Sequence, residues 1–211
     1  MQVVIFAGGA IQPGPSVDEA LARADLVIAA DSGAEAALRY GHFPTFVVGD
    51  FDSLDQQVKE KLHGSGSQIR PAAAEKDETD TELAVQLAVQ QGATQITLLG
   101  ALGGMRFDHT MANVLLLAGY QSPPMRIVDG SSSCWLLRGP GMAHIDGKAG
   151  ELLSLLPLTA DAREVSTKGL YYPLRGETLH FGKPRGVSNV LTQDHAEVTL
   201  ESGMVLVIHT R

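Results

Sequence analysis

Short apolar runs alternate with helix-forming stretches over the first 130 positions of the chain. Most of the runs end in glycine or aspartate, as buried parallel strands do when they enter a loop. We expect strands at residues 3–7, 26–30, 46–49, 95–99 and 126–128, and a marginal strand at residues 68–71. The intervening stretches predict helices at residues 17–24, 34–40, 53–62, 79–91 and 108–120. In the last helix the inner face is expected to carry Met111, Val114, Leu115 and Ala118. This alternation predicts an α/β fold with a doubly wound, mainly parallel sheet and helices on both faces.

The pattern changes after about residue 130, where short runs recur between Gly, Pro, Asp and Asn and no helical period remains. We expect strands at residues 151–156, 163–166, 177–181, 196–200 and 204–209. Short strands with this punctuation predict a smaller, all-β sandwich or barrel. Proline, serine and glycine cluster within residues 120–141, which predicts the boundary there. The expected domains are therefore an α/β domain at residues 1–130 and a β domain at residues 131–211.

Charge and cysteine content narrow the class of protein. A net charge of −8 argues against nucleic acid or an anionic membrane surface as the main partner, because both bind clustered basic charge. The single cysteine, Cys134, cannot form an internal disulfide, which fits a reducing compartment and a buried structural thiol. No apolar stretch has the length of a membrane span, and the first residues are typical of a strand rather than a signal peptide. We therefore expect a cytoplasmic protein.

Acidic side chains follow two of the predicted strands. Asp50 and Asp52 stand two apart after the third strand, so they share one face of an extended segment, while Phe51 points to the opposite face and into the core. Two adjacent carboxylates favour a bound Mg²⁺, and the alternative is a strand end followed by an Asx turn with Ser53. Asp31 follows the second strand and is either a ligand-binding residue at the sheet edge or a helix N-cap.

A second acidic cluster occupies residues 76–82, with the sequence KDETDTE. Thr79 and Glu82 have the spacing of a capping box at the start of a helix. Four carboxylates exceed what a cap requires, and Asp80 could complete a metal site with Asp50 and Asp52. Lys76 would then serve as a counter-charge or as a phosphate contact.

Glycines and a basic residue precede the helix predicted at residues 108–120. Gly103 and Gly104 allow backbone N–H groups to approach an anion, and Arg106 offers a planar fork for phosphate oxygens. Asp108 can also be a helix N-cap, and His109 an exposed helical residue. The chain contains neither GxxxxGK[ST] nor GxGxxG, which excludes a P-loop NTPase and a standard dinucleotide site.

Three residues of the β half have two possible roles each. Ser188 and Asn189 are typical of a turn whose side chains bond to the backbone, but they could also bind a ligand. Tyr172, next to Tyr171, is either a core residue or part of an exposed stacking surface.

Together these segments resemble the thiamine pyrophosphokinase (thiamine diphosphokinase) family over nearly the whole chain. The segment DSG at residues 31–33 is similar to the family's DGG, residues 49–53 to its GDFDS, and residues 77–80 to its D-x-T-D. Residues 106–109 with Asn113 resemble R-[LF]-D-H…N, and residues 169–174 and 187–189 resemble the GLKYPL-like and SN elements. Three features depart from the pattern: Ser32 replaces a glycine, Met105 lengthens the segment before Arg106, and Tyr172 stands where some members have tryptophan.

The resemblance implies Mg²⁺-dependent transfer of pyrophosphate from ATP to the hydroxyl of thiamine, with release of AMP. It also implies a homodimer in which the site is shared between the α/β domain of one subunit and the β domain of the other. Asp50, Asp52 and Asp80 would hold Mg²⁺ and act in catalysis with Arg106. The residues implied to bind the substrates are Asp31, Asp77, Thr79, Asp108, His109, Asn113, Tyr172, Ser188 and Asn189, the last three from the thiamine side.

Two other functions remain open at this point. A related pyrophosphokinase acting on a pterin alcohol would share the α/β half, and only β-domain residues such as Ser188 and Asn189 favour thiamine. A non-catalytic small-molecule-binding protein of the same fold is the second alternative. The retained carboxylates argue against it, because an unused cluster of like charges lowers stability.

Overall fold

The computed structural model describes residues 1–51, 54–73 and 75–211. By its contacts the chain divides into two compact units, Met1–Ser131 and Ser132–Arg211. Each unit has its own elements and its own core, and each is described by itself. None of the helices in the described ranges combines the length and the apolar character needed to cross a membrane.

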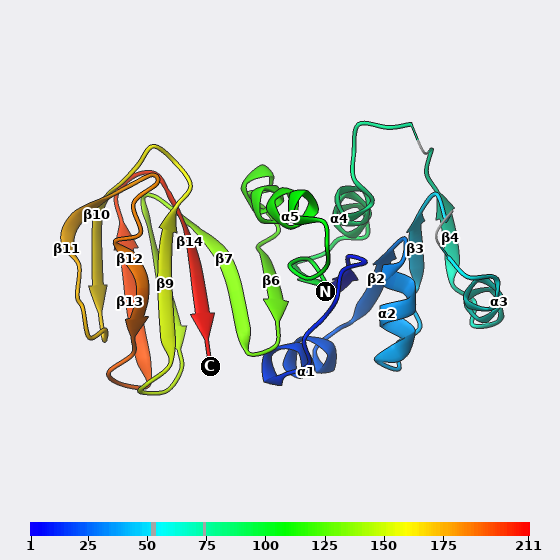
Figure 1. The fold of residues 1–211 in the computed structure, drawn as a ribbon, viewed down its shortest axis with the longest axis horizontal. Helices are drawn as coiled ribbons and strands as arrows, with labels where there is room; N and C mark the ends of the chain where they lie inside the picture. The colour runs from blue at the N-terminus through cyan, green and yellow to red at the C-terminus, as the bar shows by residue number, and fades with distance from the viewer. Residues whose placement is uncertain (52–53, 74) are drawn as a thin grey trace. The chain divides into compact units, whose positions relative to one another are not determined.

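Unit 1 is built on six parallel strands (Figure 1). In space they follow the order β6-β5-β1-β2-β3-β4. The strands are β1 Gln2–Phe6, β2 Leu26–Ala30, β3 Phe46–Gly49, β4 Gln68–Pro71, β5 Gln95–Leu99 and β6 Met125–Asp129. The chain moves outward from β1 to β4, then returns to place β5 on the other side of β1. The strand order therefore reverses between β1 and β5, which is where open α/β sheets form their ligand crevice.

Helices cover both faces of this sheet (Figure 1). They are α1 Pro15–Ala22, α2 Gly33–Arg39, α3 Gln56–Gly64, α4 Asp80–Gln90 and α5 Phe107–Gly119. The first three share an apolar cluster with alternate residues of β1, β2 and β3, to which Phe51 also packs, partly buried. Helix α4 packs against β1, β2 and β3, with Ala84, Val85 and Ala88 fully buried. The predicted doubly wound α/β architecture is confirmed.

The inner face of α5 differs from the prediction. Met111 and Leu115, expected to be buried, are 42% and 54% exposed, while Asn113 and Leu117 are buried. The amide of Asn113 donates to the carbonyl of Ala101, so this polar side chain must face the sheet. Leu117 lies four residues later and shares that face. Hydrophobicity alone therefore predicted the wrong orientation of the helix.

Unit 2 consists of two antiparallel sheets around one apolar core. One sheet has the order β12-β9-β14-β7 and the other the order β11-β10-β13-β8. The strands are β7 Ser132–Arg138, β8 Gly141–Asp146, β9 Leu152–Pro157, β10 Asp161–Lys168, β11 Arg175–His180, β12 Gly186–Val190, β13 His195–Leu200 and β14 Met204–Thr210. The separate antiparallel β domain predicted from the sequence is confirmed, and its thiol, Cys134, is buried.

Three strands of unit 2 were not predicted. β7 and β8 lie in or beside the segment expected to be a linker, and β12 includes Ser188 and Asn189, expected to lie in a turn. Each becomes a strand through pairing: β7 pairs with β14 along its whole length, β8 with β13, and β12 with β9. Long-range pairing therefore overrides the local turn signals of serine, asparagine and glycine.

Candidate active site

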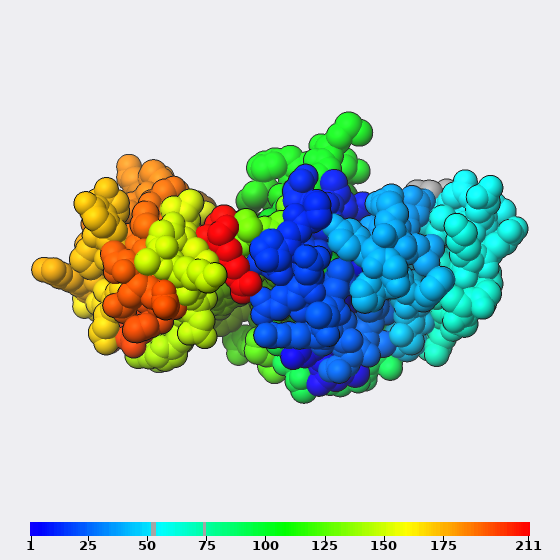
Figure 2. Space-filling view, turned by 90° about the horizontal axis from the view of Figure 1, so that it is seen from below, coloured from blue at the N-terminus to red at the C-terminus, as the bar shows by residue number. Residues whose placement is uncertain are grey.

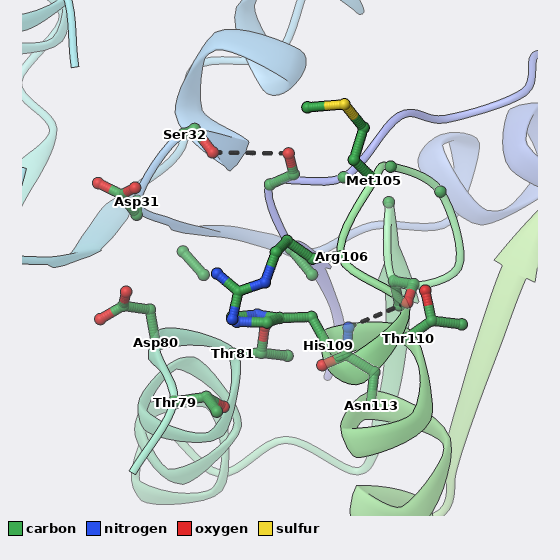
Figure 3. A pocket seen from close by; sticks show the side chains of 18 residues that line it. Asp31, Ser32, Thr79, Asp80, Thr81, Met105, Arg106, His109, Thr110 and Asn113 are labelled. Carbon is green, nitrogen blue, oxygen red and sulfur yellow. Dashed lines mark hydrogen bonds between the residues drawn. The ribbon is translucent and has the colours of Figure 1, made fainter. Parts of the chain in front are cut away.

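A cavity of about 310 Å³ opens at the point where the strand order of unit 1 reverses (Figure 3). The loops after β1, β2 and β5 form part of its wall, and the first turns of α4 and α5 form the rest. Its polar and glycine lining consists of Gly8, Gly9, Asp31, Ser32, Thr79, Asp80, Thr81, Gly100, Gly103, Gly104, Arg106, His109, Thr110 and Asn113. Six residues implied by the resemblance therefore line one cavity, although they come from three separate segments: the loop after β2, the start of α4, and the segment from Arg106 into α5.

Glycines let the loops after β1 and β5 touch through their backbones. The Gly9 N–H donates to the Gly100 carbonyl at 3.0 Å. A Cβ at Gly9 would lie 2.3 Å from the carbonyl oxygens of both Gly100 and Gly103, and a Cβ at Gly103 would lie 2.1 Å from that of Ala10. No side chain fits at these positions. The result is a wall of bare backbone, the kind of surface that approaches phosphate groups closely.

Helix α5 fixes the loop after β5 with two side chains. Thr110 donates from its hydroxyl to the Leu102 carbonyl at 3.2 Å, and Asn113 donates from Nδ2 to the Ala101 carbonyl at 3.0 Å. Both residues also line the cavity. Thr110 and Thr81 were not predicted as site residues. Their signal in the sequence is a hydroxyl in the first turn of a helix that follows a strand end.

The segment after β2 places Asp31 and Ser32 in the cavity wall. Asp31 has a φ of +45°, and its N–H donates to the Val48 carbonyl at 2.8 Å. Ser32 is the N-cap residue of α2 with a φ of −59°, so a serine here has no left-handed backbone to strain. The N-cap position of α2 therefore belongs to Ser32 rather than to Asp31, although the Ser32 side chain makes no capping hydrogen bond.

The start of α4 brings an ion pair to the cavity. Thr79 caps the helix, accepting a hydrogen bond from the Glu82 N–H at 3.1 Å, which confirms the predicted cap. Asp80 lines the cavity, and its carboxylate lies 2.6 Å from the Lys76 ammonium. Figure 3 shows Asp31 and Asp80 on one side of the cavity, with Arg106 and His109 opposite them. Asp80 therefore pairs with a cationic side chain, although Lys76 itself is not among the residues that line the cavity.

The predicted metal trio is not assembled by the described residues. Asp50 and Asp77 are exposed and are not among the cavity-lining residues, and Asp52 lies outside the described residues. Within residues 1–51, 54–73 and 75–211, no three His, Cys, Asp or Glu side chains are grouped to hold a metal ion. The donor chemistry still fits Mg²⁺, because Asp80 offers carboxylate oxygens and its partner is a cation. The metal site stays a prediction.

Arg106 and Asp108 form an exposed ion pair at the start of α5. The Nε of Arg106 lies 3.0 Å from Oδ1 of Asp108, and Nη2 lies 2.6 Å from Oδ2. Hydrogen bonding to Arg106 lowers the pKa of Asp108 to about 2, and the pair also raises the pKa of Arg106. Asp108 does not cap α5, whose N-cap residue is Arg106 itself. The carboxylate therefore orients the guanidinium that lines the cavity.

We expect Asp108 to titrate with a pKa of about 2 in the intact protein and with a higher pKa in the Arg106→Gln variant, because the hydrogen bond from Arg106, the largest cause of the depression, is then removed. Because the folded-state pKa is depressed, the ion pair favours the folded state above pH 3.8 and loses this contribution as the pH falls through 2. Carboxyl chemical shifts followed by NMR as a function of pH provide the measurement. An unchanged pKa in the variant would show that Arg106 is not the cause.

Three implied ligand-binding residues lie in unit 2. Tyr171 and Tyr172 are 65% and 58% exposed, with ring centroids 4.8 Å apart in an edge-to-face arrangement, so they belong to the surface rather than the core. Ser188 is exposed with a φ of +58°, while its neighbour Asn189 is buried.

Comparison with known proteins agrees with this division of the chain. Residues 17–128 match the family described as thiamin pyrophosphokinase, catalytic domain. The chain belongs to the thiamin pyrophosphokinase family. Residues 143–205 match that family's vitamin B1 binding domain, so Tyr172, Ser188 and Asn189 lie in the part described as binding the vitamin. The resemblance seen in the sequence is confirmed.

Relatives and solved structures of thiamin pyrophosphokinases match most or all of the chain. The thiamine pyrophosphokinase of Bacillus subtilis is 27% identical over 209 residues, which are 98% of this chain and 97% of the relative. Thiamine pyrophosphokinase 3 of Oryza sativa is 30% identical over 81% of this chain and 67% of its own length. The crystal structure of the Bacillus subtilis enzyme has a TM-score of 0.88 at 26% identity, covering 100% of this chain and 99% of the other. That of the Geobacillus thermodenitrificans protein has a TM-score of 0.85 at 30% identity, covering 100% and 98%.

Proposed function

We propose that this chain is a Mg²⁺-dependent thiamine diphosphokinase, which transfers the pyrophosphoryl group of ATP to the hydroxyl of thiamine and releases AMP. The observation that carries the proposal is that residues 17–128 match the family's catalytic domain and residues 143–205 its vitamin B1 binding domain. The cavity of unit 1 supports it, since bare backbone, an arginine and acidic residues meet there. Such a site suits a nucleoside triphosphate that arrives with a metal ion.

The triphosphate is proposed to bind in the cavity of unit 1. The glycine backbone of the loops after β1 and β5 can approach phosphate oxygens, and Arg106 provides a fork for them. The two carboxylate oxygens of Asp108 accept hydrogen bonds from the Arg106 guanidinium and so hold it at the edge of the cavity. Asp31, Thr79 and His109 complete the nucleotide-binding wall in this proposal.

Asp80, with Asp50 and Asp52, is proposed to hold Mg²⁺. These carboxylates would hold the ion beside the triphosphate, where it would supply positive charge to offset that of the phosphates. The Lys76 ammonium lies 2.6 Å from the Asp80 carboxylate. If Asp80 bound the metal ion, Lys76 would be free to contact the phosphates instead. The proposal uses Asp77 as a further substrate contact of the same segment.

The reaction needs positioning more than covalent chemistry from the protein. The hydroxyl oxygen of thiamine forms a bond to the β-phosphorus of ATP, and the bond from that phosphorus to the oxygen bridging to the α-phosphorus breaks. AMP leaves with the bridging oxygen, and the hydroxyl proton passes to solvent or to a cavity carboxylate. Tyr172 and Ser188 of unit 2 are proposed to bind the thiamine ring system.

The assay that tests the function distinguishes AMP from ADP. Purified protein with MgATP and thiamine is expected to form AMP and thiamine diphosphate in equal amounts, because a whole pyrophosphoryl group is transferred. Formation of ADP, or no consumption of ATP, would contradict the proposal. A parallel reaction with a pterin alcohol in place of thiamine tests the related pyrophosphokinase, and product formed only there would favour it.

A homodimer is proposed, with the site completed by the β domain of the second subunit. Helix α5 supports it, because Phe107, Met111 and Leu115 form an exposed apolar stripe, being 74%, 42% and 54% exposed. These residues are four apart and share one face of the helix, where water contact is unfavourable. Light scattering coupled to gel filtration should give twice the 22.3 kDa chain mass, and Leu115→Glu should lower it. A chain that is monomeric at all concentrations would contradict this proposal.

A cytoplasmic location is also proposed. The cysteine content supports it, because the single cysteine, Cys134, cannot form an internal disulfide, which suits a reducing compartment. Cell fractionation tests this, and recovery of the protein outside the cytoplasmic fraction would contradict it.

A further inference from the structure

The side chain of Asn189 makes three hydrogen bonds to backbone groups of its own unit. Its Oδ1 accepts hydrogen bonds from the N–H groups of Tyr172 and Val190, each at 3.0 Å. Its Nδ2 donates to the carbonyl of Tyr172 at 2.7 Å. Asn189 is only 7% exposed. A carboxamide oxygen has two acceptor positions, and both are used here.

These contacts fix the backbone of an exposed aromatic residue. Asn189 accepts from the N–H and donates to the C=O of the same residue, as an opposing strand does in an antiparallel ladder. The Tyr171 N–H adds a bond to the Val190 carbonyl at 2.9 Å. The turn at Tyr171 and Tyr172 is therefore tied to β12 by three hydrogen bonds, while both rings remain on the surface.

A bulge in β12 separates Asn189 from its neighbour Ser188. The pairing of β12 with β9 shifts register between Gly186 and Asn189, and Ser188 has a φ of +58°. The Ser188 N–H donates to the Ser154 hydroxyl at 3.0 Å, and the Ser188 side chain is exposed. Bulges commonly re-aim a side chain beside a functional site. Here the bulge turns Ser188 to the surface while Asn189 faces inward.

We propose that Asn189 is a positioning residue that holds Tyr172 in place for thiamine, and that it does not itself contact the substrate. The inference rests on the proposed function, and it changes the role implied for Asn189 by the sequence. Tyr172 and Ser188, which are exposed, remain the groups that meet the ring. Without Asn189 the turn must be ordered when thiamine binds, and this ordering weakens binding.

A double-mutant cycle of Asn189→Ala with Tyr172→Ala tests the proposal. In the native background, Asn189→Ala should raise the KM for thiamine roughly tenfold and change the KM for ATP less than about twofold. In the Tyr172→Ala background, the same substitution should change the thiamine KM less than about twofold, because its effect passes through Tyr172. An equal rise in the thiamine KM in both backgrounds, or no rise in the native background, would overturn the proposal.

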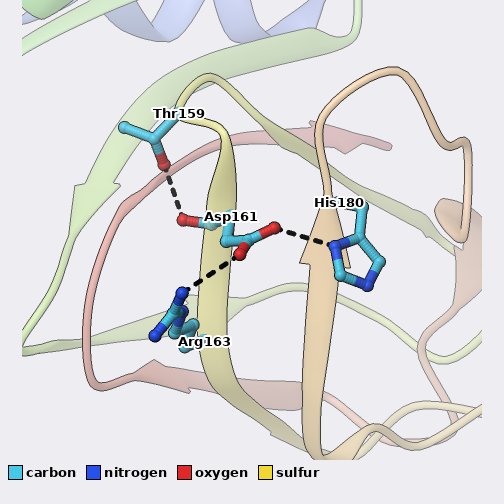
Figure 4. A network of polar contacts seen from close by, with 4 residues as sticks. All are labelled: Thr159, Asp161, Arg163 and His180. Atoms are coloured by element: carbon cyan, nitrogen blue, oxygen red, sulfur yellow. Dashed lines mark hydrogen bonds and ion pairs between the residues drawn. The ribbon is translucent and has the colours of Figure 1, made fainter.

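Thr159→Val is a matched control from the same unit (Figure 4). The Thr159 hydroxyl donates to the Asp161 carbonyl at 2.9 Å and accepts from the Met204 N–H at 3.1 Å, so valine removes two side-chain bonds to the backbone. Figure 4 shows this hydroxyl beside the surface network of Asp161, Arg163 and His180. The control should lower thermal stability and leave the thiamine KM unchanged. If Thr159→Val also raised the thiamine KM about tenfold, at about the same loss of stability, the rise would be a general effect of destabilisation.

Amide hydrogen exchange measures how firmly the Asn189 side chain holds the Tyr172 backbone, and it requires no catalytic turnover. The Tyr172 N–H should exchange slowly in the native chain and in Thr159→Val, and at least about tenfold faster in Asn189→Ala. If the alanine variant does not fold, Asn189→Asp keeps the shape and the acceptor, loses the donor to the Tyr172 carbonyl, and should also raise the thiamine KM. Native protein that makes no AMP from thiamine refutes the proposed function. Slow exchange of the Tyr172 N–H that persists in Asn189→Ala refutes the positioning role of Asn189.

Discussion

Replacing Asp80 with asparagine is expected to lower kcat/KM for pyrophosphate transfer by about 100-fold or more. Asp80 lines the cavity of unit 1, and its carboxylate lies 2.6 Å from the Lys76 ammonium. Asparagine has nearly the same shape but no charge, so it can neither neutralise Lys76 nor bind Mg²⁺ as a carboxylate does. The cap of α4 is made by Thr79, so the helix should stay intact. AMP formation measured over a range of thiamine concentrations at fixed MgATP gives kcat/KM, with circular dichroism to check the fold.

The control for this substitution is Asp55→Asn. Asp55 caps α3 by accepting from the Gln57 N–H at 2.7 Å, and asparagine is an equally good N-cap residue. Its activity should therefore stay near that of the native chain. Binding of Mn²⁺ with a non-hydrolysable ATP analogue, followed by electron paramagnetic resonance, separates the metal role from other effects on rate. An Asp80→Asn variant that turns over within about threefold of the native rate would show that the metal assignment is wrong.

Replacing Gly9 with alanine should lower both stability and activity. The new Cβ would lie 2.3 Å from two carbonyl oxygens, those of Gly100 and Gly103. Since backbone rather than a flexible side chain is in the way, the loops after β1 and β5 must separate. Overpacking of this kind costs about 1–3 kcal/mol of unfolding free energy. The cavity walls move with the loops, so we also expect kcat/KM to fall by about tenfold or more.

Urea unfolding and the AMP assay measure these two effects. Gly119→Ala is the matched control, because Gly119 ends α5 and a Cβ there would meet nothing within 4 Å. Alanine favours the helix, so this variant should be unchanged or more stable by up to about 1 kcal/mol. A Gly9→Ala variant with native stability and native rate would show that the two loops tolerate separation.

The sequence predicted elements well where local signals suffice. The bounds of β2, β3 and β5 were predicted correctly, because each is an apolar run bounded by polar, turn-forming or glycine residues. α5 was predicted as a helix but with the wrong inner face, since burial of Asn113 depends on the carbonyl of Ala101 in another segment. β12 was missed for a similar reason. It is a strand because β9 pairs with it, which no local pattern in its own residues shows.

The candidate site was predicted only in part by the same reasoning. Acidic residues after parallel strands must lie at one edge of the sheet, and this rule led to Asp31 and, with the helix start, to Asp80. The rule gives no loop conformation, so it could not separate Asp80, in the cavity wall, from Asp77, which is exposed and outside it. The contact between the glycine loops could not be predicted either, because it depends on distances between two backbones far apart in sequence.

The place of β1 in the sheet bears on how the chain folds during synthesis. β1 is made first, yet it lies between β2 and β5, and its Gln2–Phe6 segment pairs with Gln95–Leu99. One edge of this apolar strand therefore stays unpaired until most of unit 1 has left the ribosome. Exposed strand edges of this kind promote aggregation, and late, non-local pairing slows folding. The interval between synthesis of β1 and synthesis of β5 is therefore the period in which this edge is open to pairing with other chains.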